Sequence, residues 1–124
     1  MLFRSRQLAT HLATPVWIID DQGELVFFNE PAEVALGIAF SEIGSLVAVD
    51  LAAMFDVTEV SGEPLAEDDL PVITTLRTQQ PSSRRLRFQA KDGVWRVVDV
   101  MAMPINVHGD RFLGVFSAFW EVET

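Results

Sequence analysis

The chain has 124 residues, which fits one domain, and 49% of them are hydrophobic, which is enough for a full core. It contains no cysteine, and this excludes disulfides, thiolate nucleophiles and cysteine-ligated metal centres. The net charge of −9 argues against nucleic acid as a direct partner, because phosphates repel such a surface. The sequence also lacks an apolar run of ~18 residues, so we expect no membrane-spanning helix. Because the lack of cysteine gives no reason to place the chain outside the cytoplasm, we expect a cytoplasmic protein.

The N-terminal part predicts a flanking helix followed by a β-hairpin. Residues 3–13 have an amphipathic pattern with Leu8 and Leu12 on one face, and Pro15 ends that helix. Residues 15–20 and 24–28 are apolar runs separated by the turn sequence Asp-Gln-Gly, which is typical of a hairpin. We therefore expect a flanking helix over residues 1–14 and a domain over residues 15–124.

Short helices are expected in the middle of the chain. Asn29 is a good N-cap for a helix that ends at Gly37. A second short helix is indicated at about residues 47–55. Residues 67–79 predict a longer helix with acidic residues at its start and Arg77 near its end, and Pro71 requires that it begin near Asp69 or Leu70.

The last third predicts three antiparallel strands, over residues 83–90, 94–105 and 111–122, with turns at 91–93 and 108–110. Side chains alternate between the two faces of such a strand. If Asp99 and Ser117 face water, the face toward the helices carries Leu86, Phe88, Arg96, Val98, Val100, Ala102, Gly114, Phe116 and Ala118.

The ordered set of segments resembles the PAS domain family. "PVWIIDDQGELVFFNEPAEVALG" is similar to its opening hairpin and first helix, "GEPLAEDDLPVITTLRTQQP" to its central loop and helix, and "KDGVWRVVDVMAMPI" and "HGDRFLGVFSAF" to its final strands. The family often closes with Asp-x-Thr, whereas this chain ends Glu121-Val122-Glu123-Thr124. The resemblance implies an α+β PAS fold, a five-stranded antiparallel sheet with short helices over one face and an N-terminal amphipathic helix.

Family members hold ligands between sheet and helices, so the resemblance implies a ligand-pocket region. The candidates for its lining are Phe28, Leu51, Phe55, Ile73, Leu76, Phe88, Arg96, Val98, Val100, Phe116 and Ala118. Two interpretations stay open: these side chains fill a solid core, or they line a cavity for a small apolar, fatty acid-like ligand. Arg96 could pair with a ligand carboxylate, but a position at a strand end, in contact with solvent, is the favoured interpretation.

The ligand itself is not identified by the sequence. Covalent flavin and photoactive-yellow-type chromophores need a cysteine, and Phe116 stands where flavin-binding relatives place a glutamine. Haem-binding relatives take an axial histidine from the long helix, which here has none; His11 and His108 lie elsewhere. No metal site is predicted.

The opposite sheet face is also apolar and must be covered. Its candidates for a dimer interface are Leu8, Leu12, Trp17, Trp95, Val97, Met101, Val115 and Phe119.

No catalytic residue is predicted, since Asp99 is the only acid with apolar neighbours in a strand and the alternation places it outside. We expect a non-catalytic sensory domain that binds a small ligand and dimerises to relay a signal to an effector domain or partner signalling protein. The alternative is a ligand-free dimerisation or docking module with a filled core.

Overall fold

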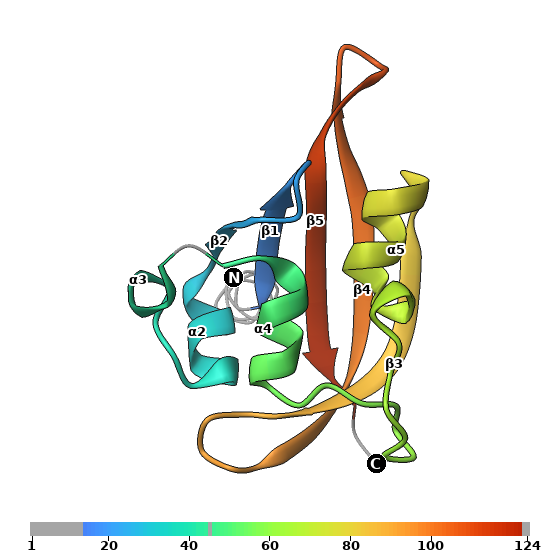
Figure 1. Cartoon of the computed structure of the whole chain (residues 1–124). Coiled ribbons are helices and arrows are strands. Elements are labelled where there is room, and N and C mark those ends of the chain that lie inside the picture. Colours follow the sequence, from blue (N-terminus) through green and yellow to red (C-terminus); the bar gives the residue numbers. More distant parts are fainter. Residues whose placement is uncertain (1–13, 45, 123–124) are drawn as a thin grey trace, which may run out of the picture.

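The computed structural model describes residues 14–44 and 46–122, which form one sheet with helices over one face (Figure 1). The five strands are all antiparallel to their neighbours and lie in the order β2-β1-β5-β4-β3. Their bounds are β1 Val16–Asp20, β2 Leu25–Phe28, β3 Ser82–Gln89, β4 Trp95–Val107 and β5 Arg111–Glu121. This is the α+β fold with a five-stranded sheet that the sequence predicted.

The helices lie between β2 and β3 in the sequence and cover the same face of the sheet (Figure 1). Their bounds are α2 Glu30–Leu36, α3 Phe40–Ile43, α4 Ala48–Met54, the 3-10 helix η1 Glu67–Asp69 and α5 Pro71–Thr78. In Figure 1, α2 and α4 lie in front of β1 and β2, while α5 lies in front of β4 and β3. The core therefore lies between these helices and the sheet.

Asn29 joins the hairpin to α2 with three hydrogen bonds. Its Oδ1 accepts from the amides of Val16 (3.0 Å) and Ala32 (3.1 Å), and its Nδ2 donates to the carbonyl of Thr14 (3.0 Å). The N-cap predicted from the sequence is thus confirmed, and it also fixes the start of β1. At the other end of α2, Gly37 has the left-handed conformation (φ 80°) that ends many helices, again as predicted.

The helix predicted over residues 67–79 is interrupted. Leu70 is extended (φ −67°, ψ 127°) between η1 and α5, because a residue that precedes a proline avoids the helical conformation. Pro71 then occupies the first turn of α5, where a missing amide costs nothing. Arg77 contacts Asp68 of η1 at 2.7 Å, so its partner is a side chain rather than the end of its own helix.

The face prediction for β5 is wrong by one residue. Val115, Ser117 and Phe119 point toward the helices, whereas Phe116 and Ala118 lie on the other face, opposite Met103 and Met101 of β4. The prediction assumed that Ser117 faces water. In the structure its hydroxyl donates to the carbonyl of Met101 (2.9 Å), and this bond satisfies a side chain that has no exposed surface.

The helix predicted over residues 3–13, with Leu8 and Leu12, lies outside the described residues. The division into a flanking segment and a domain from residue 15 stays a prediction. No helix in the part of the chain that the structure describes is long and apolar enough to cross a membrane.

Candidate functional site

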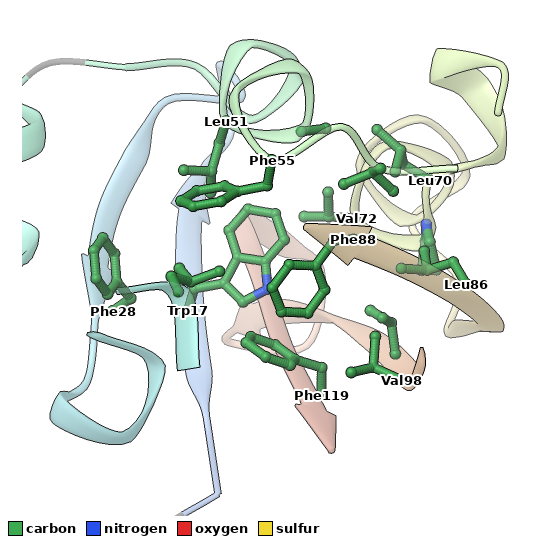
Figure 2. A pocket seen from close by; sticks show the side chains of 15 residues that line it. Trp17, Phe28, Leu51, Phe55, Leu70, Val72, Leu86, Phe88, Val98 and Phe119 are labelled. Atoms are coloured by element: carbon green, nitrogen blue, oxygen red, sulfur yellow. The ribbon is translucent and has the colours of Figure 1, made fainter. Parts of the chain in front are cut away.

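An apolar cavity of about 80 Å³ lies between the helices and the sheet (Figure 2). Every strand and the helices α2, α4 and α5 contribute to its walls. The lining side chains are Trp17, Phe28, Leu36, Leu51, Ala52, Phe55, Val57, Leu70, Pro71, Val72, Leu86, Phe88, Val98, Val100 and Phe119. None of them carries a charge, so the site is suited to an apolar ligand rather than to acid–base chemistry.

Main-chain hydrogen bonds hold α4 over the cavity at both ends. At its start, the amide of Ala48 donates to the carbonyl of Gly23 in the β1–β2 turn (2.8 Å). At its end, the carbonyl of Phe55 accepts from the amide of Gln89 in β3 (2.8 Å). These bonds fix the distance between α4 and the sheet, so the space below the helix is a consequence of the backbone and not only of side-chain packing.

Aromatic rings form much of the cavity wall. The ring of Phe88 makes edge-to-face contacts with Phe55 (centroids 6.3 Å apart) and Phe119 (5.9 Å). Aromatic pairs prefer this edge-to-face arrangement, which holds the three rings at fixed angles around the cavity. In Figure 2 the indole of Trp17 lies among these rings, below Leu51.

The structure brings many of the predicted pocket residues together and excludes others. Phe28, Leu51, Phe55, Phe88, Val98 and Val100 line the cavity. The remaining candidates do not line it: Ile73 and Leu76 pack elsewhere against the core, Arg96 lies at the hairpin end of β4, and Phe116 and Ala118 lie on the opposite face.

Three residues assigned to the outer face by the sequence lie on the cavity side. Trp17 and Phe119 line the cavity, and Val115 is fully buried in the core. The three wrong assignments have the same cause. Trp17 pairs with Ser117 and Ile19 with Val115, so the facing of β5 also determines which β1 side chains point toward the helices. Of the α4 side of the cavity, sequence reasoning found Leu51 and Phe55 but missed Ala52, although the helical period contains that signal.

Charged groups lie around the cavity rather than in it. Arg96 contacts Asp92 in the same hairpin (3.2 Å), and the ammonium of Lys91 lies 5.7 Å from the ring centroid of Phe55. Arg96 thus has the strand-end position that the sequence favoured. Within residues 14–44 and 46–122, no three His, Asp or Glu side chains gather where they could hold a metal ion.

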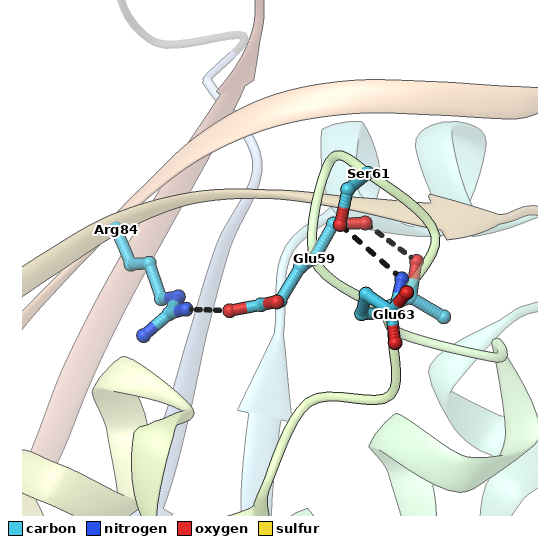
Figure 3. A network of polar contacts seen from close by, with 5 residues as sticks. Glu59, Ser61, Glu63 and Arg84 are labelled. Carbon is cyan, nitrogen blue, oxygen red and sulfur yellow. Dashed lines mark hydrogen bonds and ion pairs between the residues drawn. The ribbon is translucent and has the colours of Figure 1, made fainter.

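The basic cluster of β3 is engaged by partners within the chain. Arg84 pairs with Glu59 in the loop before η1 (Figure 3), and Arg87 donates to Thr58 Oγ1 (3.0 Å) and stacks on Trp95. Arg85 binds Asp99 of β4 at 2.9 Å. The Arg85 guanidinium lowers the pKa of the Asp99 carboxyl through this hydrogen bond and, to a smaller extent, its charge. Asp99 is therefore the ion-pair partner of Arg85 on the outer face of the sheet.

The sheet face away from the helices is largely apolar. Neighbouring strands place Phe27, Ile18, Phe116 and Met103 in one cross-strand row. Phe27, Trp95, Met103 and Trp120 each expose more than 40% of their surface. Of the predicted dimer-face residues, Trp95, Val97 and Met101 do belong to this outer face.

Comparisons with known proteins agree with this architecture. The family model described as "PAS domain" matches residues 4–87, which is more than half of the chain. The chain therefore belongs to the PAS domain family. Proteins of this family are sensory and signalling modules that are generally non-catalytic, often dimerise, and occur with effector domains.

Solved structures with the same fold have low sequence identity. The PAS domain of a protein from Colwellia psychrerythraea is 18% identical, with 98% of each chain covered and a TM-score of 0.63. The PAS domain of nitrogen regulation protein NR(II) from Vibrio parahaemolyticus is 19% identical, with 90% of this chain and 91% of that chain covered and a TM-score of 0.64. The LOV domain of the blue-light activated histidine kinase EL346 from Erythrobacter litoralis is 12% identical, with 90% and 97% covered and a TM-score of 0.67. No curated protein shows a significant match to the chain.

Proposed function

We propose that this PAS domain is a cytoplasmic, non-catalytic sensor that binds a small apolar ligand between α4, α5 and the sheet. The observation that carries the proposal is the cavity of about 80 Å³ with a lining free of charged side chains. A cavity lined by apolar groups stays dry or takes an apolar molecule, because water needs polar partners to remain there.

The size of the cavity favours a ligand of only a few non-hydrogen atoms. It has roughly half of the ~150 Å³ of an engineered apolar cavity that binds benzene in another protein. A complete flavin or haem needs several times this volume. A long acyl chain would fit only if α4 moved away from the sheet, and the main-chain bonds at both ends of α4 oppose that movement.

Native mass spectrometry followed by denaturing extraction tests the proposal. We expect a stoichiometric small molecule that disappears on denaturation. The variant Ala52→Leu places a larger side chain in the cavity and should abolish retention, while Ala53→Leu, at the exposed neighbouring position of the same helix, should leave it unchanged. Equal retention by both variants would show that any ligand binds elsewhere.

We further propose that the outer sheet face is a homodimer interface that relays occupancy of the cavity. Its support is the set of exposed large apolar side chains spread over this face, Phe27, Trp95, Met103 and Trp120, on a protein whose charge of −9 otherwise favours solubility. Substitution Met103→Glu should shift the mass of the native protein from dimer to monomer. A wild-type monomer at high concentration would exclude the dimer.

The same face supports a second candidate, a ligand-free dimerisation or docking module. In that case native mass spectrometry should find dimers without a bound molecule. Ala52→Leu should then stabilise the fold without changing the signal-dependent behaviour, since nothing would need to enter the cavity.

A further inference from the structure

Arg87 is a cation on the outer sheet face that has no carboxylate partner within residues 14–44 and 46–122. Its neighbours in β3, Leu86 and Phe88, line the cavity, so its own side chain points to the opposite face. Among the described residues its guanidinium contacts Thr58 and Trp95, and no hydrogen bond of its Nη1 or Nη2 group occurs there. Most other arginines of this part of the chain pair with a carboxylate, namely Arg77, Arg84, Arg85 and Arg96. Arg87 therefore keeps free donors in the forked geometry that matches a carboxylate.

The guanidinium of Arg87 is held in place on several sides. The main chains of Arg87 and Thr58 exchange two hydrogen bonds (both 3.0 Å), and Arg87 Nε donates to Thr58 Oγ1 (3.0 Å). The guanidinium carbon lies 4.2 Å from the ring centroid of Trp95. A Cβ at Gly62 would lie 3.1 Å from Arg87 Nη2, so a glycine lets the loop approach this closely. A side chain fixed in advance loses less entropy when a partner binds.

Asp99 is a carboxylate on the same face that can accept further hydrogen bonds. In the ladder of β3 and β4, Arg85 lies opposite Asp99 and Arg87 opposite Val97, so Arg87 and Asp99 are diagonal neighbours. Each oxygen of Asp99 accepts one bond from Arg85 (2.9 and 3.2 Å). Because a carboxylate oxygen has two lone pairs, each keeps an acceptor site. The Asp99 side chain also retains 32% of its exposure.

We propose that the guanidinium of Arg87 binds the carboxylate of Asp99 in a second copy of the chain, and that the reverse contact forms at the same time. A two-fold axis that lies in the interface and passes between these two residues places each of them opposite the other in the second copy. The face is then self-complementary in charge. The inference rests on the proposed homodimer and names the residues that pair across it.

Two exposed tryptophans flank this pair. Trp95 stacks on Arg87, and Trp120 lies opposite Asp99 in the ladder of β4 and β5. They are 42% and 47% exposed. Trp95 lies beyond Arg87 on one side of the axis and Trp120 beyond Asp99 on the other, so the same axis brings Trp95 toward Trp120 of the second copy. Tryptophan and arginine are the residues that most often carry the binding energy of an interface, and a surrounding apolar contact excludes water from them.

Two charge-reversal variants test the reciprocal pair by native mass spectrometry and sedimentation of the full chain. Arg87→Glu and Asp99→Arg each place like charges opposite one another twice in a homodimer. We expect each variant alone to dimerise at least about tenfold more weakly than the wild-type chain, because like charges across an interface are repulsive. An equimolar mixture should form a mixed dimer of nearly wild-type affinity, since both contacts then join a carboxylate and a guanidinium. The two variants differ in mass, so the mixed dimer is identified directly.

Two further variants control for net charge and for folding. Arg111→Glu makes the same change of charge at an exposed position at the start of β5 and should leave dimerisation unchanged. Asp99→Arg also removes the bond to Arg85 within the chain. If that variant does not fold, Asp99→Arg combined with Arg85→Glu keeps two opposite charges at the intrachain pair and takes its place in the mixture.

The possible failures are distinguishable. If the wild-type chain dimerises and Arg87→Glu dimerises as tightly as Arg111→Glu, the inference about Arg87 is overturned and the proposed homodimer stands. The same holds if both reversal variants are monomeric and their mixture forms no mixed dimer, because Asp99 is then not the partner of Arg87. A wild-type chain that stays monomeric at high concentration overturns both the inference and the proposed homodimer.

Discussion

The sequence predicted Phe116 on the face toward the helices and Phe119 on the outer face, whereas the structure has the reverse. Truncation of each side chain distinguishes the two arrangements. Phe119 is 7% exposed, lines the cavity and contacts Phe88. Replacing a buried phenylalanine by alanine costs about 3–5 kcal/mol of unfolding free energy. Because one side of the ring already borders the cavity, we expect Phe119→Ala to fall near the lower limit, about 3 kcal/mol.

Phe116 is only partly buried, on the outer face between Ile18 and Met103. Its ring makes fewer contacts, so Phe116→Ala should cost about 1 kcal/mol. The expected difference between the two variants is therefore about 2 kcal/mol. A domain of this size has a total stability of about 5–15 kcal/mol, so the difference is easily measured.

Urea unfolding followed by tryptophan fluorescence gives both values. Phe119→Leu, which keeps most of the volume, is the control and should cost less than about 1.5 kcal/mol. The titrations need two protein concentrations, because Phe116 belongs to the proposed dimer interface and a dimer makes stability depend on concentration. A cost for Phe116→Ala equal to or above that for Phe119→Ala would refute the face that the structure assigns to β5.

Substitutions at three further positions test the hairpin and the surface of the sheet, each by urea unfolding. Gly114→Ala would place its Cβ 2.1 Å from the carbonyl oxygen of Ile19, so β1 and β5 would have to separate. We expect a loss of about 3 kcal/mol of unfolding free energy. A loss below about 1 kcal/mol would contradict this contact. Asn29→Ala removes all three hydrogen bonds of the side chain and should cost about 2 kcal/mol of unfolding free energy. Asn29→Asp keeps the acceptor and should cost about half of that. Equal costs would show that the bond donated to Thr14 carries the effect. The lowered pKa of Asp99 means that its ion pair stabilises the fold above the unfolded pKa of about 3.9 and that this contribution is lost as the pH falls below it. Asp99→Asn should therefore lose less stability than the wild type between pH 7 and pH 3, and an equal loss would contradict the assigned pair.

Local signals made much of the fold predictable from the sequence. The hairpin of β1 and β2, the Asn29 cap and the Gly37 end each depend on residues close together in the chain, whose backbone preferences are strong. The strand order could be stated only through the family resemblance. The split between η1 and α5 was partly visible in Pro71, which restricts where a helix can start.

The facing of β5 could not be derived with the rule that polar side chains face water. Ser117 breaks that rule because a hydroxyl can be satisfied by a single backbone carbonyl, and its partner, Met101, lies on a different strand. The register also shifts between Ile105 and Asn106, so counting alternation from β4 through the turn gives the wrong face. The error moved Phe119 and Trp17 out of the predicted site and brought Phe116 into it.

The same alternation suggests how a ligand in the cavity could change the outer face. Trp17 contacts the cavity while its neighbour Ile18 lies on the outer face, and Phe119 and Trp120 have the same relation in β5. A ligand packed against Trp17 and Phe119 would stabilise one position of β1 relative to β5, and the outer residues would move with the backbone that carries them. Binding can shift this equilibrium only as far as the ligand prefers one position over the other.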